Sequence, residues 1–264
     1  PKLRRFSHIN VFLRNHAFRR VLIFIFEGGA CIERRDELWQ SGPCFYYDTD
    51  LFPPGTDSFA LAYFARPARG DRVCDLGSGT GLLGTLLLAR EDSLTIENVE
   101  LSAPAAALAR RTFSENGWEG RAAFRTGDLR DASVLPPPGS VDYVISNPPY
   151  FPAGSGASAE GEARRNAREE CTCTLEDVCA AAKRVLRYGG RFALVHRAER
   201  LTDVLCAMRE SGIEPKRLRF LAKSAASAPS LLLVEGKRGG KSGLVIEPPL
   251  IPGSPEWEHV YFRA

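Results

Sequence analysis

The chain lacks the cysteine and histidine patterns that hold structural metals. Its seven cysteines are an odd number and include no paired CxxC motif. The lone CxC of Cys171 and Cys173 has no neighbours that complete a four-ligand zinc set, and the four histidines form no recognisable ligand cluster. We therefore expect no metal site, a reducing cytoplasm as the compartment, and cysteines that act mainly as small core residues.

Acidic residues are missing from the first 26 positions. The apolar run Val21–Phe26 in this segment is far too short to cross a membrane and short for a signal-peptide core. We expect no membrane association. Three interpretations of the segment compete, and a packing helix or sequence upstream of the natural start is favoured over a basic arm on RNA. Its cations are Lys2, Arg4, Arg5, Arg14, Arg19 and Arg20.

Internal repeats are also absent, and the overall composition is that of a soluble globular protein. Apolar residues make up 44% and charged residues 25% of the chain. A length of 264 residues is enough to bury a full core, as one domain with a small appendage. The formal net charge of +3 permits a nucleic-acid partner without demonstrating one.

Apolar runs of strand length alternate with helix-length segments through most of the chain. The alternation stops after residue 211, where two expected strands follow each other with no helix between them. This order predicts an α/β fold with a Rossmann-like, doubly wound, mostly parallel sheet and an antiparallel C-terminal edge. The expected strands are 71–76, 94–101, 123–126, 141–146, 191–196, 217–223 and 231–237, and the expected helices are 82–90, 103–116, 175–187 (closed by Gly189-Gly190) and 201–211.

A glycine-rich loop connects the strand at 71–76 to the helix at 82–90. Glycines let the backbone approach a ligand closely, the helix start offers free N–H groups, and Thr80 is a candidate helix cap. The residues from Gly79 to Gly84 fit the dinucleotide pattern GxGxxG, although Gly84 falls inside the helix rather than in the turn. Asp75 instead suits a ligand with a cationic amine, such as S-adenosylmethionine. The predicted cofactor-binding residues are Asp75, Gly77, Ser78, Gly79, Thr80 and Gly81.

Two further acidic residues follow expected strands. Glu100 is placed to accept both ribose hydroxyls of such a cofactor, and Asp128 to accept from the adenine amino group. Each acid taken singly is equally well explained as a solvated residue at a strand end. Their order, after the glycine loop and before the motif described next, favours cofactor binding.

Asn147-Pro148-Pro149-Tyr150 closes the buried strand at 141–146. Two prolines stop the strand and stiffen the turn, and the carboxyl edge of an open α/β sheet is where ligands bind. The Asn147 side-chain oxygen and the Pro148 carbonyl can each accept one hydrogen bond from a planar –NH2 group, and Tyr150 can stack on its ring. Alone, the tetrapeptide is equally compatible with a simple Pro-Pro loop terminator. With the glycine loop, it predicts Asn147, Pro148, Pro149 and Tyr150 as catalytic residues, and Asn147 also beside the cofactor.

The glycine loop followed by the NPPY motif resembles the class I S-adenosylmethionine-dependent methyltransferases that act on planar amines. Within that class, the chain is most similar to the bacterial family that methylates N6 of the adenine next to the anticodon of a valine tRNA. The resemblance implies S-adenosylmethionine as the cofactor, tRNA as the partner, and Tyr150, Phe151 and Arg168 as substrate-binding residues. One departure is Glu169, where the family usually has His. The similar stretches are 50–62, 147–151, 167–170, 190–201, 214–220 and 240–244.

The resemblance also implies a domain organisation. We expect a basic N-terminal extension at 1–37, whose membership of the catalytic fold the sequence leaves open, a methyltransferase domain at 38–253, a C-terminal tail at 254–264, and a monomer. Three basic clusters are candidates for a phosphate track along the RNA, although each residue alone is equally an ordinary solvated cation. They are Lys216, Arg217, Arg219 and Lys223; Lys237, Arg238 and Lys241; and Arg164, Arg165 and Arg168.

Three rival functions remain open. A protein glutamine N5-methyltransferase acting on a release factor shares the glycine loop and the NPPY motif, but normally has a larger helical N-terminal domain. A DNA adenine methyltransferase usually needs a separate target-recognition domain, and none is evident. A non-catalytic RNA-binding protein of the same fold is disfavoured because Asp75, Glu100 and the NPPY motif occur together.

Overall fold

The computed structural model describes residues 22–23, 33–48, 54–148 and 173–261. Its centre is an eight-stranded sheet in the order β11-β9-β10-β8-β7-β4-β5-β6. Strands β4 to β8 pair in parallel, whereas β10 runs antiparallel to both of its neighbours, β8 and β9. The predicted fold class, including the antiparallel C-terminal edge, is therefore confirmed. The strands are β4 (Arg72–Leu76), β5 (Thr95–Glu100), β6 (Ala122–Thr126), β7 (Val141–Ser146), β8 (Leu186–Arg197), β9 (Ile213–Leu221), β10 (Leu231–Arg238) and β11 (Val245–Ile246).

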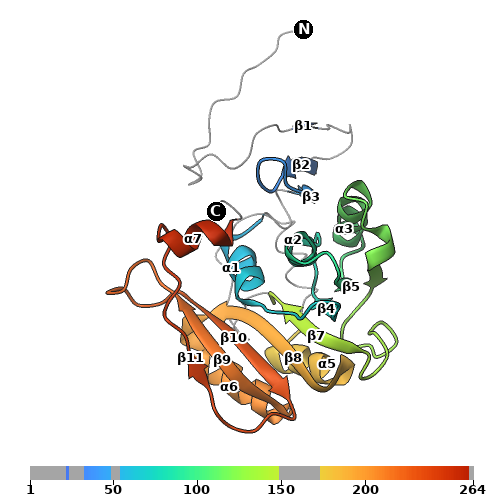
Figure 1. Ribbon diagram of the computed structural model, residues 1–264. Helices are drawn as coiled ribbons and strands as arrows, with labels where there is room; N and C mark the ends of the chain where they lie inside the picture. Colours follow the sequence, from blue (N-terminus) through green and yellow to red (C-terminus); the bar gives the residue numbers. More distant parts are fainter. Residues whose placement is uncertain (1–21, 24–32, 49–53, 149–172, 262–264) are drawn as a thin grey trace, which may run out of the picture.

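Helices cover both faces of this sheet. Figure 1 shows α1, α2 and α3 on one side of the strands and α5 and α6 on the other. Local signals set several helix starts: Ser102 caps α3 through Ala105 N, and Thr174 and Asp177 form a reciprocal capping box on α5. The helices are α1 (Thr56–Phe64), α2 (Leu82–Arg90), α3 (Ala103–Glu115), α5 (Leu175–Val185), α6 (Leu201–Glu210) and α7 (Pro255–Val260).

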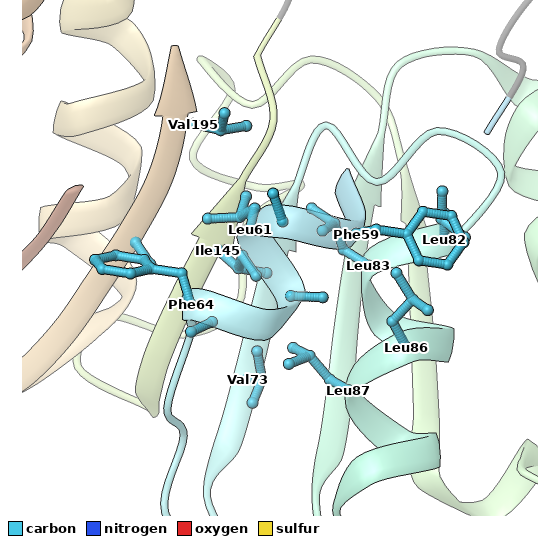
Figure 2. Close-up of a cluster of buried hydrophobic side chains, with 14 of the residues drawn as sticks. Phe59, Leu61, Phe64, Val73, Leu82, Leu83, Leu86, Leu87, Ile145 and Val195 are labelled. Atoms are coloured by element: carbon cyan, nitrogen blue, oxygen red, sulfur yellow. The ribbon is translucent and has the colours of Figure 1, made fainter. Parts of the chain in front are cut away.

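Helix α1 is buried almost all round. Figure 2 shows Phe59, Leu61 and Phe64 of α1 among side chains of α2 and of the sheet, including Leu83 and Ile145. All five side chains are at most 4% exposed. Burial of each such side chain contributes about 2 kcal/mol relative to its exposure to water. The position of α1 against α2 and the sheet is therefore strongly determined.

The boundary between α5 and β8 differs from the sequence-based expectation. The helix ends at Val185 rather than at residue 187, and the strand begins at Leu186 rather than at residue 191. Leu186 pairs with Val141, and after an irregularity Arg191 pairs with Tyr143. The two glycines at 189–190 lie within β8, in the irregular stretch between these two pairs, where Gly189 has a φ of 79°, and they do not cap the helix. The first strand of the C-terminal pair, β9, likewise begins at residue 213, four positions earlier than expected.

A second, three-stranded sheet consists of β1 (Leu22–Ile23), β2 (Glu33–Glu37) and β3 (Cys44–Asp48). One edge of β3 pairs with β2. Side chains of α3 and of Asn116 form hydrogen bonds with the backbone of its other edge. The Asn116 side chain, just past the end of α3, accepts from Cys44 N at 3.0 Å and donates to Cys44 O at 2.8 Å, and Thr112 Oγ1 accepts from Tyr46 N at 3.0 Å. The β2–β3 pair is thereby attached to the main domain, and the boundary expected after residue 37 falls between its two strands.

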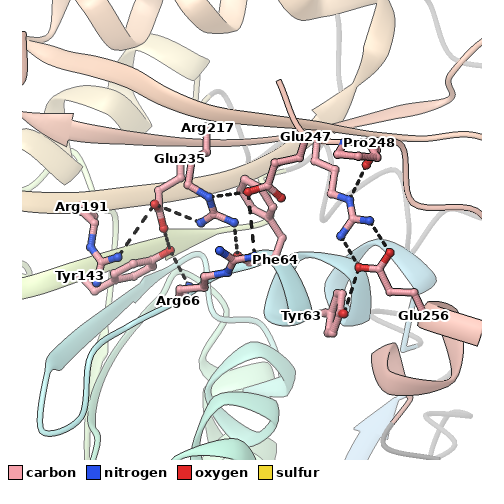
Figure 3. A network of polar contacts seen from close by, with 11 residues as sticks. Tyr63, Phe64, Arg66, Tyr143, Arg191, Arg217, Glu235, Glu247, Pro248 and Glu256 are labelled. Carbon is pink, nitrogen blue, oxygen red and sulfur yellow. Dashed lines mark hydrogen bonds and ion pairs between the residues drawn. The ribbon is translucent and has the colours of Figure 1, made fainter. Parts of the chain in front are cut away.

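The C-terminal strands are joined to the rest of the domain by a buried polar network (Figure 3). Glu235 of β10 accepts from Tyr143 of β7 at 2.5 Å and pairs with Arg217 of β9 at 3.2 Å. Nearby, Arg219 forms a two-pronged pair with Glu256 of α7, at 2.7 and 2.6 Å. Helix α7, which lies within the expected C-terminal tail, therefore packs against the domain.

Candidate active site

Three parallel strands bring the candidate residues to one edge of the sheet. Asp75 of β4 is in register with Ile145 of β7, and Leu76 with Val99 of β5. The glycine loop, Glu100 and Asn147 therefore follow one another across the carboxyl ends of adjacent strands. This is the edge at which open α/β sheets bind ligands.

The glycine loop turns back toward β5 through its backbone. The N–H groups of Gly77 and Ser78 both donate to Val99 O, at 2.9 and 3.1 Å. Gly77 has a φ of 74°, and a Cβ built there would meet nothing within 4 Å, so the loop presents bare backbone at this point. The prediction that Thr80 caps α2 is wrong, because the cap position is Gly81 and no side chain bonds to the helix start.

Asp75 is a fully buried carboxyl group with little local compensation. Its side chain is 0% exposed, and neither oxygen has a hydrogen-bond partner among the residues that the structure describes. Burial, together with the negative charge of nearby Glu100, raises the pKa of Asp75 to about 8, and the nearby backbone N–H of Gly84 opposes this only in part. A buried carboxyl in this state is suited to a cationic ligand, which would supply the missing charge and hydrogen bonds. The buried hydroxyl of Ser78 is a second polar group without a partner among these residues.

Glu100 connects the end of β5 to the loop. Its Oε2 accepts from Gly79 N and its Oε1 from Ser102 N, both at 2.7 Å. Burial raises the pKa of Glu100, and the backbone hydrogen bonds only partly oppose that effect. Each carboxylate oxygen has two lone pairs, so Glu100 can still accept from a ligand hydroxyl.

Two residues near Glu100 concern the predicted adenine end of the site. Asp128 is engaged by Arg130, whose Nε lies 3.0 Å from each carboxylate oxygen, and hydrogen bonds from Arg130 lower the pKa of Asp128. To accept a hydrogen bond from an adenine amino group, Asp128 would have to do so while it remains paired with Arg130. Leu101, which the sequence reasoning missed, is 44% exposed although it is large and apolar. Its place directly after a candidate ribose-binding acid is the signal that would have found it, because an apolar side chain there suits a nucleoside ring.

Asn147 lies at the end of β7 and contacts helix α1. Its side-chain Nδ2 donates to Ser58 Oγ at 3.0 Å. Ser58 is another residue that the sequence reasoning missed, since nothing local relates it to a position 89 residues away. Pro148 is described and buried. Pro149, Tyr150, Phe151 and Arg168, also predicted as site residues, lie outside the described residues.

The expected basic clusters are only partly on the surface. The side chains of Arg217 and Arg219 are 16% and 7% exposed and are held in the ion pairs of Figure 3. They therefore do not belong to a phosphate track. The cluster at 164–168 lies outside the described residues. Within the described ranges, no group of histidine, cysteine and acidic residues could hold a metal ion, and no helix is both long and apolar enough to cross a membrane.

Residues 54–210 match the family model described as "Methyltransferase small domain". The chain belongs to this family. The matched range contains the glycine loop, Glu100, Asn147 and Ser58, and it confirms the resemblance to methyltransferases that the sequence motifs predicted.

The curated relatives described next have one name in common. An enzyme of Aeromonas salmonicida named tRNA1(Val) (adenine(37)-N6)-methyltransferase is 35% identical over 61% of this chain and 66% of its own length. Enzymes of the same name from Pectobacterium carotovorum and Porphyromonas gingivalis are 37% and 30% identical, over 56% and 69% of this chain. The chain spans 59% and 72% of the lengths of these two relatives.

Solved structures support the fold. A predicted O-methyltransferase from Agrobacterium tumefaciens superposes with a TM-score of 0.64 at 22% identity, over 79% of this chain and 97% of its own. A putative methyltransferase bound to the Haloferax volcanii Trm112 activator superposes with a TM-score of 0.51 at 16% identity, over 70% of this chain and 90% of its own. At these identities the likeness concerns the fold alone.

Proposed function

We propose that this protein transfers a methyl group from S-adenosylmethionine to N6 of an adenine in tRNA, namely adenine 37 of a valine tRNA. The observation that carries the proposal is the buried carboxyl of Asp75, which has no hydrogen-bond partner among the described residues and lies beside Glu100 and Asn147 at one sheet edge. The adenine and the valine tRNA are taken from the names of the relatives. A tRNA substrate would also place the enzyme in the cytoplasm, and we expect it to act as a monomer.

The residues of the cofactor half fit S-adenosylmethionine group by group. Asp75 would pair with the amino-acid ammonium, and Glu100 would accept from the ribose hydroxyls. Leu101 would lie against the adenine ring, and the bare backbone at Gly77 leaves room for the ligand to approach. When bound, the cofactor supplies an electrophilic methyl group on a sulfonium centre.

The second half of the site holds the accepting amine. The side-chain oxygen of Asn147 and the carbonyl of Pro148 would each accept one hydrogen bond from the –NH2 group. Two acceptors in this arrangement favour a pyramidal nitrogen and expose its lone pair. The main catalytic contribution is therefore positioning, and no strong general base is required. Tyr150 and Phe151 are expected to stack on the extruded base, and Arg168 to contact the RNA.

A methylation assay tests the proposal. The purified protein is mixed with methyl-labelled S-adenosylmethionine and tRNA from a strain that lacks its own version of this enzyme, and the nucleosides are separated by mass spectrometry. We expect N6-methyladenosine in valine tRNA with the wild type and none with Asn147→Ala. A parallel incubation contains a bacterial release factor in place of tRNA. Label in a glutamine of that factor, without labelled RNA in the first incubation, would instead identify a protein glutamine N5-methyltransferase.

A further inference from the structure

Ser58 lies in the first turn of α1 and contacts the central residue of the amine site. Its hydroxyl oxygen accepts a hydrogen bond from Asn147 Nδ2 at 3.0 Å, and Ser58 is only 8% exposed. The contact joins a helix that precedes the glycine loop to the end of a strand that follows it.

A carboxamide has a donor side and an acceptor side, and only one of them suits an amine substrate. The –NH2 of an adenine donates, so it needs the oxygen of Asn147 and would meet a second donor if the amide were reversed. Because the amide is planar, directing Nδ2 toward Ser58 directs Oδ1 away from α1. A serine hydroxyl can accept from Nδ2 or donate to Oδ1, so Ser58 fixes the position and plane of the amide. In the structure it is Nδ2 that faces Ser58, which turns Oδ1 away from α1.

The elements that hold Ser58 are rigid. Ser58 N donates to Gly55 O at 3.2 Å and to Asp57 Oδ1 at 2.9 Å, which fixes the first turn of the helix. The next residue, Phe59, is 3% exposed and lies in the core of Figure 2. A reactive group is most effective when neighbours of this kind hold it in one geometry before the substrate arrives.

We propose that Ser58 is a positioning residue for methyl transfer: its hydroxyl fixes the Asn147 amide with the oxygen toward the accepting amine. The inference rests on the proposed function, since it assigns Ser58 a role at the same amine site. Ser58 acts through Asn147 and not through a contact with the cofactor. Its loss therefore slows the transfer step without weakening cofactor binding.

The test compares Ser58→Ala, which removes only the hydroxyl oxygen, with Ser58→Thr, which keeps it. We expect Ser58→Ala to lower the single-turnover rate of tRNA methylation about 3- to 10-fold, the range expected for loss of one neutral hydrogen bond. The dissociation constant for S-adenosylmethionine should stay within about twofold of the wild-type value. Ser58→Thr should recover most of the rate. Thr56→Ala is the matched control, because it removes a hydroxyl of the same helix that instead bonds to Tyr261 at 3.2 Å.

A second measurement needs no substrate. The side-chain amide protons of Asn147, assigned by their absence in Asn147→Ala, are followed by NMR. In Ser58→Ala they should shift and exchange faster with water, whereas in Thr56→Ala they should not change.

The two measurements separate the possible failures. A wild-type protein that methylates no tRNA would refute the proposed function, and the amide resonances would still decide the contact between Ser58 and Asn147. Unchanged resonances in Ser58→Ala, an unchanged transfer rate, or an equal loss in Ser58→Ala and Ser58→Thr would overturn the inference. So would a loss of rate that is matched by an equal loss of cofactor affinity.

Discussion

Replacing Asp75 by asparagine should stabilise the ligand-free protein at alkaline pH and weaken its binding of S-adenosylmethionine. Asp75 is 0% exposed, its oxygens have no partner among the described residues, and its pKa is raised to about 8. Asparagine is nearly the same size and carries no charge. The substitution therefore isolates the cost of ionising one buried carboxyl group.

The sign follows from proton linkage. In the unfolded chain an aspartate releases its proton near pH 4, whereas in the folded protein Asp75 keeps its proton up to about pH 8. Between these values the folded state binds more protons, so the free energy of unfolding falls as the pH rises. From pH 6 to pH 8, ionisation of Asp75 should lower the free energy of unfolding by about 2 kcal/mol, since each pKa unit corresponds to about 1.4 kcal/mol.

The assay is urea denaturation of wild type and Asp75→Asn at pH 6, 7 and 8. The difference in unfolding free energy between the two proteins should change by about 2 kcal/mol across this range, in favour of the variant. Asp92→Asn, which removes an exposed carboxylate, is the control and should parallel the wild type. Parallel curves for Asp75→Asn and wild type would refute the reasoning, because they would mean that Asp75 ionises normally.

Cofactor binding gives the complementary result. If the cationic amine of the cofactor requires the ionised carboxylate, wild-type affinity should rise with pH between 6 and 8, by up to about fiftyfold for a pKa near 8. Titration of the ligand itself affects both proteins equally, so the comparison uses the ratio of wild-type to Asp75→Asn affinity, measured by calorimetry. A ratio that does not depend on pH would show that Asp75 is not the partner of the amine.

Three further substitutions test the architecture around the site, each measured by urea denaturation. Asn116→Ala removes the side chain that bonds to the free edge of β3 and should cost about 1–3 kcal/mol, whereas an unchanged midpoint would mean that β3 is held by apolar contacts alone. Glu235→Ala removes a buried carboxylate that pairs with the half-buried Arg217 and should cost about 3 kcal/mol; a neutral effect would contradict the network of Figure 3. Gly84→Ala places a methyl group 2.9 Å from the ring of Phe113 and should cost about 1–3 kcal/mol, so a gain in stability would show that α2 can move away from β5.

Local patterns predicted much of the fold. The expected helix at 82–90 coincides with α2, and the expected helix at 103–116 extends only one residue past α3. The expected strand at 141–146 coincides with β7. These elements were predictable because apolar periodicity, capping residues and glycine positions act over a few residues. The end of α5 was not, since Gly189-Gly190 resembles a helix stop, whereas the helix ends earlier because Leu186 pairs with Val141 of β7.

The candidate site, like the fold, was predictable only in part. By itself, the sequence determined which chemical groups follow each strand: the glycine loop, Glu100 and the Asn147-Pro148 pair. Parallel strands bring such groups to a common edge in any fold of this class. Only the tertiary structure decided that β10 lies between β8 and β9, that Asp75 is buried with no hydrogen-bond partner among the described residues, and that Ser58 contacts Asn147. The reason is physical: burial and contacts between distant residues depend on how whole elements pack, and no short-range pattern in the chain records that packing.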